Sequence, residues 1–207
     1  MSRRVALLVS GASGMLLPRH LLGRLAEHPE VERIHLAVSA GASQVLRHEL
    51  GPEKTGAADL VEAAGLPERA REKISLHRDN ELDAPIASGS YRLAGTVVLP
   101  CSAGTLGALA TGSARTLVHR AGAVALKERW PLVLGFRETP LSLVHVENMR
   151  RLLYAGAVIL PPVPAFYIAG AGDGEDLGRF LDHYAMRILD KLGLDTPGEG
   201  LRWGEGA

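Results

Sequence analysis

Apolar residues along this chain follow two periods, which predict two kinds of secondary structure. Short apolar runs bounded by glycine, proline or polar residues predict buried strands, and apolar positions three and four apart predict helices. The predicted strands are residues 5–10, 34–38, 96–99, 131–136 and 157–160. The predicted helices are residues 16–26, 42–50, 117–127, 142–154 and 176–192. The polar stretch 51–78 predicts loops with at most one helix, and the small residues up to Gly112 indicate no clear element.

Strands separated by helices of this length predict right-handed crossovers and a parallel sheet. We therefore expect an α/β protein with a three-layer α/β/α architecture, Rossmann-like or flavodoxin-like, with helices on both faces of the sheet. The chain shows no internal repeat and no clear linker, so residues 1–207 are predicted to form one domain. Ligands of such sheets bind beyond the carboxyl ends of the strands, where polar residues are the first candidates for a site.

Composition and charge narrow the class of protein. The 23 basic and 23 acidic residues cancel, so no overall positive field favours nucleic acid. No apolar run reaches the roughly 20 residues that a membrane-spanning helix needs, and the N-terminus lacks a cleavable signal pattern. A single cysteine, Cys101, excludes an internal disulfide. These features predict a soluble cytoplasmic protein that does not bind nucleic acid and does not span a membrane.

The first predicted strand ends in a turn of small residues, Gly11 to Gly14, which opens the first helix. Small residues let the backbone approach a ligand, and the free N–H groups at a helix start attract an anion. A tight turn with a serine N-cap explains the same residues equally well. The full dinucleotide fingerprint is missing, because Leu16 stands where its third glycine would be and the second strand ends at Ser39 instead of an acid.

Two further strand ends carry polar residues. Residues 101–105, CSAGT, form a second small, hydroxyl-rich turn, which together with the first suits a phosphate and a flat ring. Cys101 is interpreted as a buried thiol, since no base is near it in the sequence. Arg137 can hold a phosphate through two hydrogen bonds and Glu138 can position or protonate a phosphate oxygen, with a surface ion pair as the alternative. Residues 139–140, Thr-Pro, are predicted to cap the next helix.

The chain resembles the UbiX-like flavin prenyltransferases in motifs that follow one another along nearly its whole length. The LKER…PLVL…RE and GAVILPPVPAFY blocks are specific to that family. Ser39, with Glu49 ten residues later, also fits the pattern. The matching blocks are GASG at 11–14, ASGS at 87–90, CSAGTL at 101–106, HRAGAVALKERWPLVL at 119–134, RETP at 137–140, HVENM at 145–149, GAVILPPVPAFY at 156–167 and RWGE at 202–205.

This resemblance implies an enzyme that uses reduced FMN as a prenyl acceptor. The family joins a dimethylallyl group to N5 and C6 of the flavin, usually from dimethylallyl monophosphate and without a metal. The prenylated FMN passes to a UbiD-type decarboxylase, in pathways such as ubiquinone biosynthesis. Members form large homo-oligomers, typically dodecamers, with active sites between subunits. The resemblance thus implies that the C-terminal tail, about 193–207, packs on a neighbouring subunit through Trp203, although packing on its own subunit would explain that residue equally well.

The resemblance also assigns roles to individual residues. The cations are implied to stabilise the leaving phosphate, Glu138 to share a proton with it, and Ser13 and Glu49 to act near the reacting flavin atoms. The implied FMN ligands are Gly11, Ala12, Ser13, Ser39, Ser102, Ala103, Gly104, Thr105 and Arg137. The implied donor ligands are Arg120, Lys127, Tyr167 and Arg187. The implied catalytic residues are Ser13, Glu49, Lys127 and Glu138.

Two other functions remain open from the sequence. One is an FMN-dependent decarboxylase of a cysteine-like substrate, which would need a catalytic histidine such as His20 and an asparagine motif that we do not find. The other is a non-catalytic flavin-binding subunit, which would have lost the phosphate-handling residues. The sequence departs from the family at Leu17-Pro18, where a Tyr-Gly pair is common, and at Leu82, where an aromatic residue is common.

Overall fold

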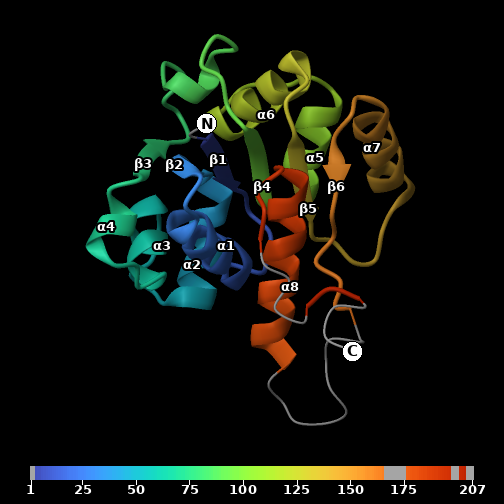
Figure 1. Cartoon of the computed structure of the whole chain (residues 1–207). Helices are drawn as coiled ribbons and strands as arrows, with labels where there is room; N and C mark the ends of the chain where they lie inside the picture. Colours follow the sequence, from blue (N-terminus) through green and yellow to red (C-terminus); the bar gives the residue numbers. More distant parts are fainter. Residues whose placement is uncertain (1–2, 166–175, 197–200, 204–207) are drawn as a thin grey trace.

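The computed structural model describes residues 3–165, 176–196 and 201–203, which form a sheet with helices on both faces (Figure 1). The strands are β1 (Arg3–Val9), β2 (Val31–Val38), β3 (Ile74–Arg78), β4 (Gly95–Cys101), β5 (Leu132–Phe136) and β6 (Val158–Ile159). The helices are α1 (Leu16–Glu27), α2 (Ala40–Leu50), α3 (Ala57–Ala63), α4 (Glu68–Arg71), α5 (Ala103–Ala110), α6 (Leu117–Glu128), α7 (Leu143–Tyr154) and α8 (Asp176–Lys191), with a 3-10 turn η1 (Pro85–Ala87). Among the described helices, none is long and apolar enough to cross a membrane.

The six strands are all parallel and lie in the order β3-β2-β1-β4-β5-β6. Val5 in β1 pairs with Ile34 of β2 on one side and with Gly95 of β4 on the other. The chain therefore winds outwards in both directions from β1, and the winding reverses between β1 and β4. In open α/β sheets, ligands bind beyond the carboxyl ends of the strands at such a reversal. The predicted fold class is confirmed.

The core consists of two apolar layers, one on each face of the sheet. Val5, Leu7 and Val9 of β1 face α1 and α8, whereas Ala6 and Leu8 face the layer of α5, α6 and α7. All five of these side chains are completely buried. Because both faces of the sheet are covered, the central strands are apolar at consecutive positions, which is why a short apolar run was sufficient to predict them.

Three local predictions were wrong. Residues 51–78 contain two short helices and the edge strand β3, whose sequence ISLHR is half-exposed and mostly polar, so it lacks the apolar run of a central strand. Residues 103–110 form α5, whose small residues give little contrast between a buried and an exposed face. Residues 139–140 do not cap α7. Ser142 does, because its hydroxyl accepts a hydrogen bond from the amide of His145 at 3.3 Å.

Candidate functional site

Two strand ends at the switch point are joined by a buried hydroxyl. Ser10, at the end of β1, is 1% exposed and donates from its Oγ to the carbonyl of Pro100 at 2.9 Å. The same Oγ accepts a hydrogen bond from the amide of Ser102 at 2.8 Å. The Ser102 hydroxyl in turn donates to Thr105 Oγ1 at 3.2 Å and caps α5 by accepting from the Thr105 amide. The loops after β1 and β4 are therefore held in a fixed relation.

The 11–14 turn is tied to the end of α2 by a carboxylate. Glu49 accepts hydrogen bonds from the amides of Gly14, at 3.0 Å, and Met15, at 2.7 Å. Since α1 has no side-chain cap of its own, Glu49 takes that place and its negative charge faces the positive end of the helix. Gly14 has φ of +114°, which favours glycine. The structure thus places Glu49 beside the turn.

The helices that follow β1, β2 and β4 begin at this edge of the sheet. The α1 turn follows β1, Ser39 caps α2 by accepting from the Ala42 amide at 3.2 Å, and Ser102 caps α5. Helix starts carry unpaired N–H groups and partial positive charge, so their convergence favours a phosphate or another anion. Gly11, Ser13 and Gly104 are exposed at this edge, which leaves their backbone open to a ligand. Ala12 and Ala103 are half-buried beside them.

Arg137 brings a cation to the same edge. Its amide donates to the carbonyl of Cys101 at 3.1 Å, which fixes the end of β5 against the end of β4, and its side chain is exposed. Glu138 next to it is half-buried, and its carboxylate accepts from the Thr139 amide at 3.2 Å. Cys101 is fully buried, and burial raises the pKa of its thiol, which agrees with a structural thiol and not a nucleophile.

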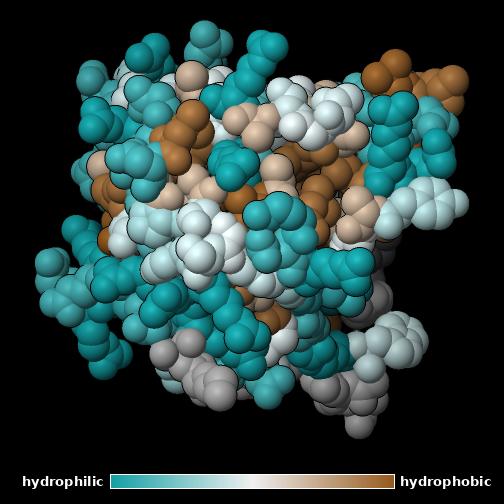
Figure 2. Space-filling model, turned by 90° about the horizontal axis from the view of Figure 1, so that it is seen from above, coloured by the Kyte–Doolittle hydropathy of each residue, from teal (hydrophilic) through white to brown (hydrophobic). Residues whose placement is uncertain are grey.

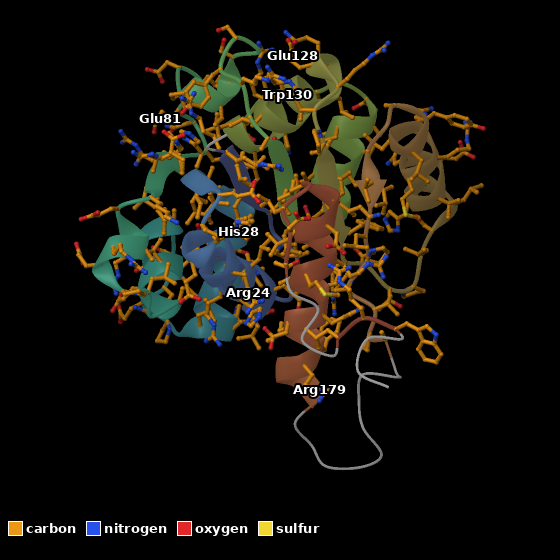
Figure 3. All side chains as sticks on the ribbon, in the orientation of Figure 1. Arg24, His28, Glu81, Glu128, Trp130 and Arg179 are labelled. Carbon is orange, nitrogen blue, oxygen red and sulfur yellow. The ribbon has the colours of Figure 1, made fainter. Side chains whose placement is uncertain are left out.

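Lys127 lies at the opposite edge of the sheet from these residues. It belongs to the last turn of α6, and Trp130, three residues later, lines a hollow with Arg3 and Ala94 where β1 and β4 begin. Figure 3 shows Glu128 and Trp130 at the top of the view, at this edge. A seven-residue strand such as β4 spans about 20 Å, so Lys127 of one chain does not reach the turns at the carboxyl edge of the same chain.

Arg120 lies on the same helix as Lys127, in the first turn of α6. It donates from Nε to the carbonyl of Ala87, at 3.0 Å, in η1. Lys127 Nζ pairs with Glu128 at 2.8 Å, and both head groups lie against Gly89. Arg120, Lys127 and the 87–90 motif therefore form one polar cluster along α6. We call it the α6 cluster.

The remaining expected residues lie in α8 and in the C-terminal part of the chain. Arg187 is exposed on α8, and Tyr167 lies outside the described residues. Trp203 is 80% exposed, whereas Arg202 pairs with Asp190 of α8 at 2.7 Å. His20 pairs with Asp182 at 2.8 Å, which links α1 to α8.

The two departures from the family pattern leave the local fold intact. Pro18 falls in the first turn of α1, where proline is tolerated, and Leu82 is half-exposed between β3 and η1.

Sequence reasoning missed the contribution of Ser10 and the capping role of Glu49. Ser10 is the last residue of an apolar run and looks like part of the strand. Its role follows only from the pairing of β1 with β4, which brings the Pro100 carbonyl and the Ser102 amide to it. Glu49 is 35 residues from the helix start that it caps. Among the described residues, no group of three or more His, Cys, Asp or Glu is placed to hold a metal ion.

Comparison with known proteins gives consistent matches over nearly the whole chain. A model of the flavoprotein family matches residues 1–188. The flavin prenyltransferase UbiX of Deinococcus radiodurans is 41% identical, over 98% of this chain and 94% of that protein. The crystal structure of AnUbiX (PadA1) in complex with FMN and dimethylallyl pyrophosphate has a TM-score of 0.82 and 36% identity, with full coverage of both chains. A dodecameric FMN-dependent UbiX-like decarboxylase from Escherichia coli O157:H7 has a TM-score of 0.80 and 36% identity, over 97% of this chain and 98% of that one.

Proposed function

The chain belongs to the UbiX-like flavin prenyltransferases of the flavoprotein family, and we propose that it transfers a dimethylallyl group from dimethylallyl phosphate to reduced FMN. The observation that carries this proposal is the convergence of three helix starts and the exposed Arg137 at the switch point of the sheet. The relative of known structure with the same fold holds FMN and dimethylallyl pyrophosphate.

We propose that the carboxyl edge of the sheet binds FMN. The amides of Gly11, Ser13, Ala103 and Gly104 and the hydroxyl of Ser39 can donate to the ligand, and Arg137 adds a positive charge. Ala12, Ser102 and Thr105 shape the two loops through hydrogen bonds of their own. The Ser10 hydroxyl fixes the two loops beforehand, so little conformational freedom remains to be lost when a ligand binds. The reduced flavin supplies the electron-rich atoms that attack the prenyl group.

The donor phosphate is assigned to the α6 cluster, completed by Glu138, Arg187 and Tyr167. Because Lys127 and the flavin edge lie at opposite edges of one sheet, these two parts of the site meet only if different copies of the chain contribute them. We therefore propose a homo-oligomer, a dodecamer as in the relative from E. coli, in which one copy supplies the flavin edge and another supplies Lys127 and Arg120.

The surface of α7 supports such an assembly. Only Leu152 of this helix is buried, whereas several apolar residues of the helix and its start face outward; part of this surface is seen at the right of Figure 2. The exposed residues are Leu141, Leu143, Val144, Val146, Leu153 and Tyr154. Contiguous exposed apolar residues mark an interaction surface. Trp203 of the C-terminal tail adds a second exposed apolar group, which we assign to contact with a neighbouring subunit.

The residues divide the chemistry between them. Lys127, Arg120 and Arg187 stabilise the negative charge that develops on the leaving phosphate. Glu138 shares a proton with that phosphate, and Glu49 takes a proton at the flavin ring after the new bond forms. Ser13 lies in the turn whose next two amides Glu49 holds, so it is placed to orient the same flavin atoms. No metal takes part in this scheme.

The product would pass to a UbiD-type decarboxylase in the cytoplasm, for example in ubiquinone biosynthesis. The two other functions are not favoured. His20 is engaged by Asp182 and links two helices, as a structural residue would. A non-catalytic subunit would not need Arg120, Lys127, Arg137 and Glu138, all of which are present.

The test is anaerobic incubation of the protein with reduced FMN and dimethylallyl monophosphate, followed by mass spectrometry of the released flavin. The proposal predicts a flavin heavier by one five-carbon prenyl unit. It also predicts that Lys127→Ala, which changes an exposed side chain, lowers the rate about 100-fold or more. Unmodified FMN from protein that binds FMN, with the diphosphate donor also tried, would contradict the proposal.

A further inference from the structure

Four side chains form a continuous series of hydrogen bonds, and none of the four has a part in the proposed binding of FMN or of the donor phosphate. His77 Nδ1 is 3.3 Å from Glu81 Oε1, His35 Nδ1 is 2.9 Å from His77 Nε2, and His35 Nε2 is 3.0 Å from the Tyr91 hydroxyl. The two imidazole rings are stacked, with centroids 5.2 Å apart. We call this group the histidine chain.

When both rings are neutral, the hydrogen bonds of the histidine chain run in one direction. The Glu81 carboxylate only accepts, so His77 then donates from Nδ1, and its Nε2 accepts from His35 Nδ1. His35 Nε2 is left to accept from the Tyr91 hydroxyl. Burial, followed by the neighbouring His77, Arg33 and Arg4, lowers the pKa of His35 to about 4, which keeps that ring neutral.

The histidine chain holds both ends of one segment. His35 and His77 belong to the paired strands β2 and β3, whereas Glu81 and Tyr91 stand near the two ends of the connection that follows β3. That connection carries η1 and the 87–90 motif, and it lies over α6 (Figure 1). At the Tyr91 end the Arg4 guanidinium lies 4.9 Å from the ring centroid, which adds a further contact.

The same segment is fastened to α6 along its outer side. The carbonyl of Asp79 accepts from the Leu117 amide at 2.7 Å, and its carboxylate accepts from the Val118 amide at 3.0 Å. Further along, Arg120 donates to Ala87, and Gly89 lies against Lys127. The position of the segment therefore fixes where the α6 cluster presents its cations.

We propose that His35 and His77 are positioning residues for the donor phosphate, because they hold segment 79–91 against α6 and so set the geometry of Arg120 and Lys127. This inference rests on the proposed function. The inference predicts an effect on binding of the donor and none on binding of FMN. The FMN edge is built from the ends of β1, β2, β4 and β5, which are not part of segment 79–91.

The test uses the assembled protein and three variants. Tyr91→Phe removes one hydrogen bond and keeps the ring, His77→Asn keeps a donor near the Nδ1 position and removes the acceptor for His35, and His28→Asn is the matched control. His28 is also a buried histidine, 7% exposed, and its Nε2 is 3.0 Å from the Asp195 carbonyl. It follows α1 and has no hydrogen bond to segment 79–91 or α6 among those found for its side chain. For each protein we would measure KM for dimethylallyl monophosphate, kcat, the Kd for FMN and hydrogen exchange of peptides covering 79–91.

Tyr91→Phe and His77→Asn should raise the donor KM and speed exchange in 79–91 by about three- to tenfold, the value of one hydrogen bond. Their FMN Kd should equal that of the wild type, and His28→Asn should change neither the donor KM nor that exchange. The inference would be overturned if both variants kept the hydrogen exchange and the donor KM of the wild type. It would also be overturned if they lost affinity for FMN by the same factor as for the donor. Hydrogen exchange needs no catalysis, so a protein that fails to prenylate FMN would refute the proposed function and still test the positioning of the segment.

Discussion

Replacing Gly11 by alanine tests whether the flavin edge depends on the close approach of two backbones. An alanine Cβ at position 11 would lie 2.8 Å from the carbonyl carbon and 2.9 Å from the oxygen of Gly41, at the start of α2. Both atoms belong to the backbone, so no side chain can turn aside. The 11–14 turn or the start of α2 must therefore move by about 0.6 Å before the contact reaches 3.4 Å.

Overpacking of this kind costs about 1–3 kcal/mol. We expect Gly11→Ala to lower the free energy of unfolding by that amount, measured by urea denaturation without ligand. Because the shift also moves the turn relative to Ser39, we expect the Kd for FMN, measured by flavin fluorescence, to rise about tenfold or more.

Gly23→Ala is the matched control in α1. Its Cβ would be 3.8 Å from Leu66 Cδ2, an ordinary contact, and alanine in a helix interior is about 0.5–1 kcal/mol better than glycine. This variant should be at least as stable as the wild type, with unchanged FMN binding. If Gly11→Ala matched Gly23→Ala in both measurements, the reasoning about the two backbones would be refuted.

Three further predictions concern individual side chains. Glu49→Gln keeps an oxygen that can cap α1 but cannot take a proton, so FMN should still bind while the prenylation rate falls about 100-fold or more; an unchanged rate would remove Glu49 from the mechanism. Arg187→Ala changes an exposed residue, so stability should stay within about 0.5 kcal/mol while the donor KM rises; an unchanged KM would show that Arg187 is not a donor ligand. Since the pKa of His35 is lowered to about 4 from 6.5, the unfolded chain binds more protons between these values, and stability should fall by about 2–3 kcal/mol as the pH drops from 6.5 to 4. Denaturation midpoints across this range should show that fall, and His35→Asn should show less of it.

The sequence was sufficient to predict the elements with a clear apolar pattern, which are the buried strands and the amphipathic helices. The central strands are apolar at successive positions, and the helix starting at Leu16 repeats its leucines at helical spacing. β3 escaped prediction because an edge strand is half-exposed and can be polar, as His77 and Arg78 are. α5 escaped because alanine and glycine differ little between its faces.

The candidate site was also predictable from the sequence only in part. The motifs placed residues 11–14, Ser39, 102–105 and Arg137 at strand ends, and the parallel sheet then gathered them at one edge. The sequence did not reveal that Lys127 lies at the other edge, because that depends on the direction in which α6 runs back across the sheet. Contacts between distant positions, such as Ser10 with Ser102, have no sequence pattern of their own.

The most direct measurement tests whether two copies of the chain build one prenylation site. Glu49→Gln impairs the flavin edge and Lys127→Ala impairs the α6 cluster, so each protein alone should form little prenylated FMN. The two variants are then co-expressed so that they assemble together. A site in the mixed assembly has both parts intact when its flavin edge comes from the Lys127→Ala chain and its cations come from the Glu49→Gln chain. Mass spectrometry of the flavin should then show activity returning to about a quarter of the wild-type value at equal mixing. Activity no higher than the average of the two variants would contradict a site shared between copies.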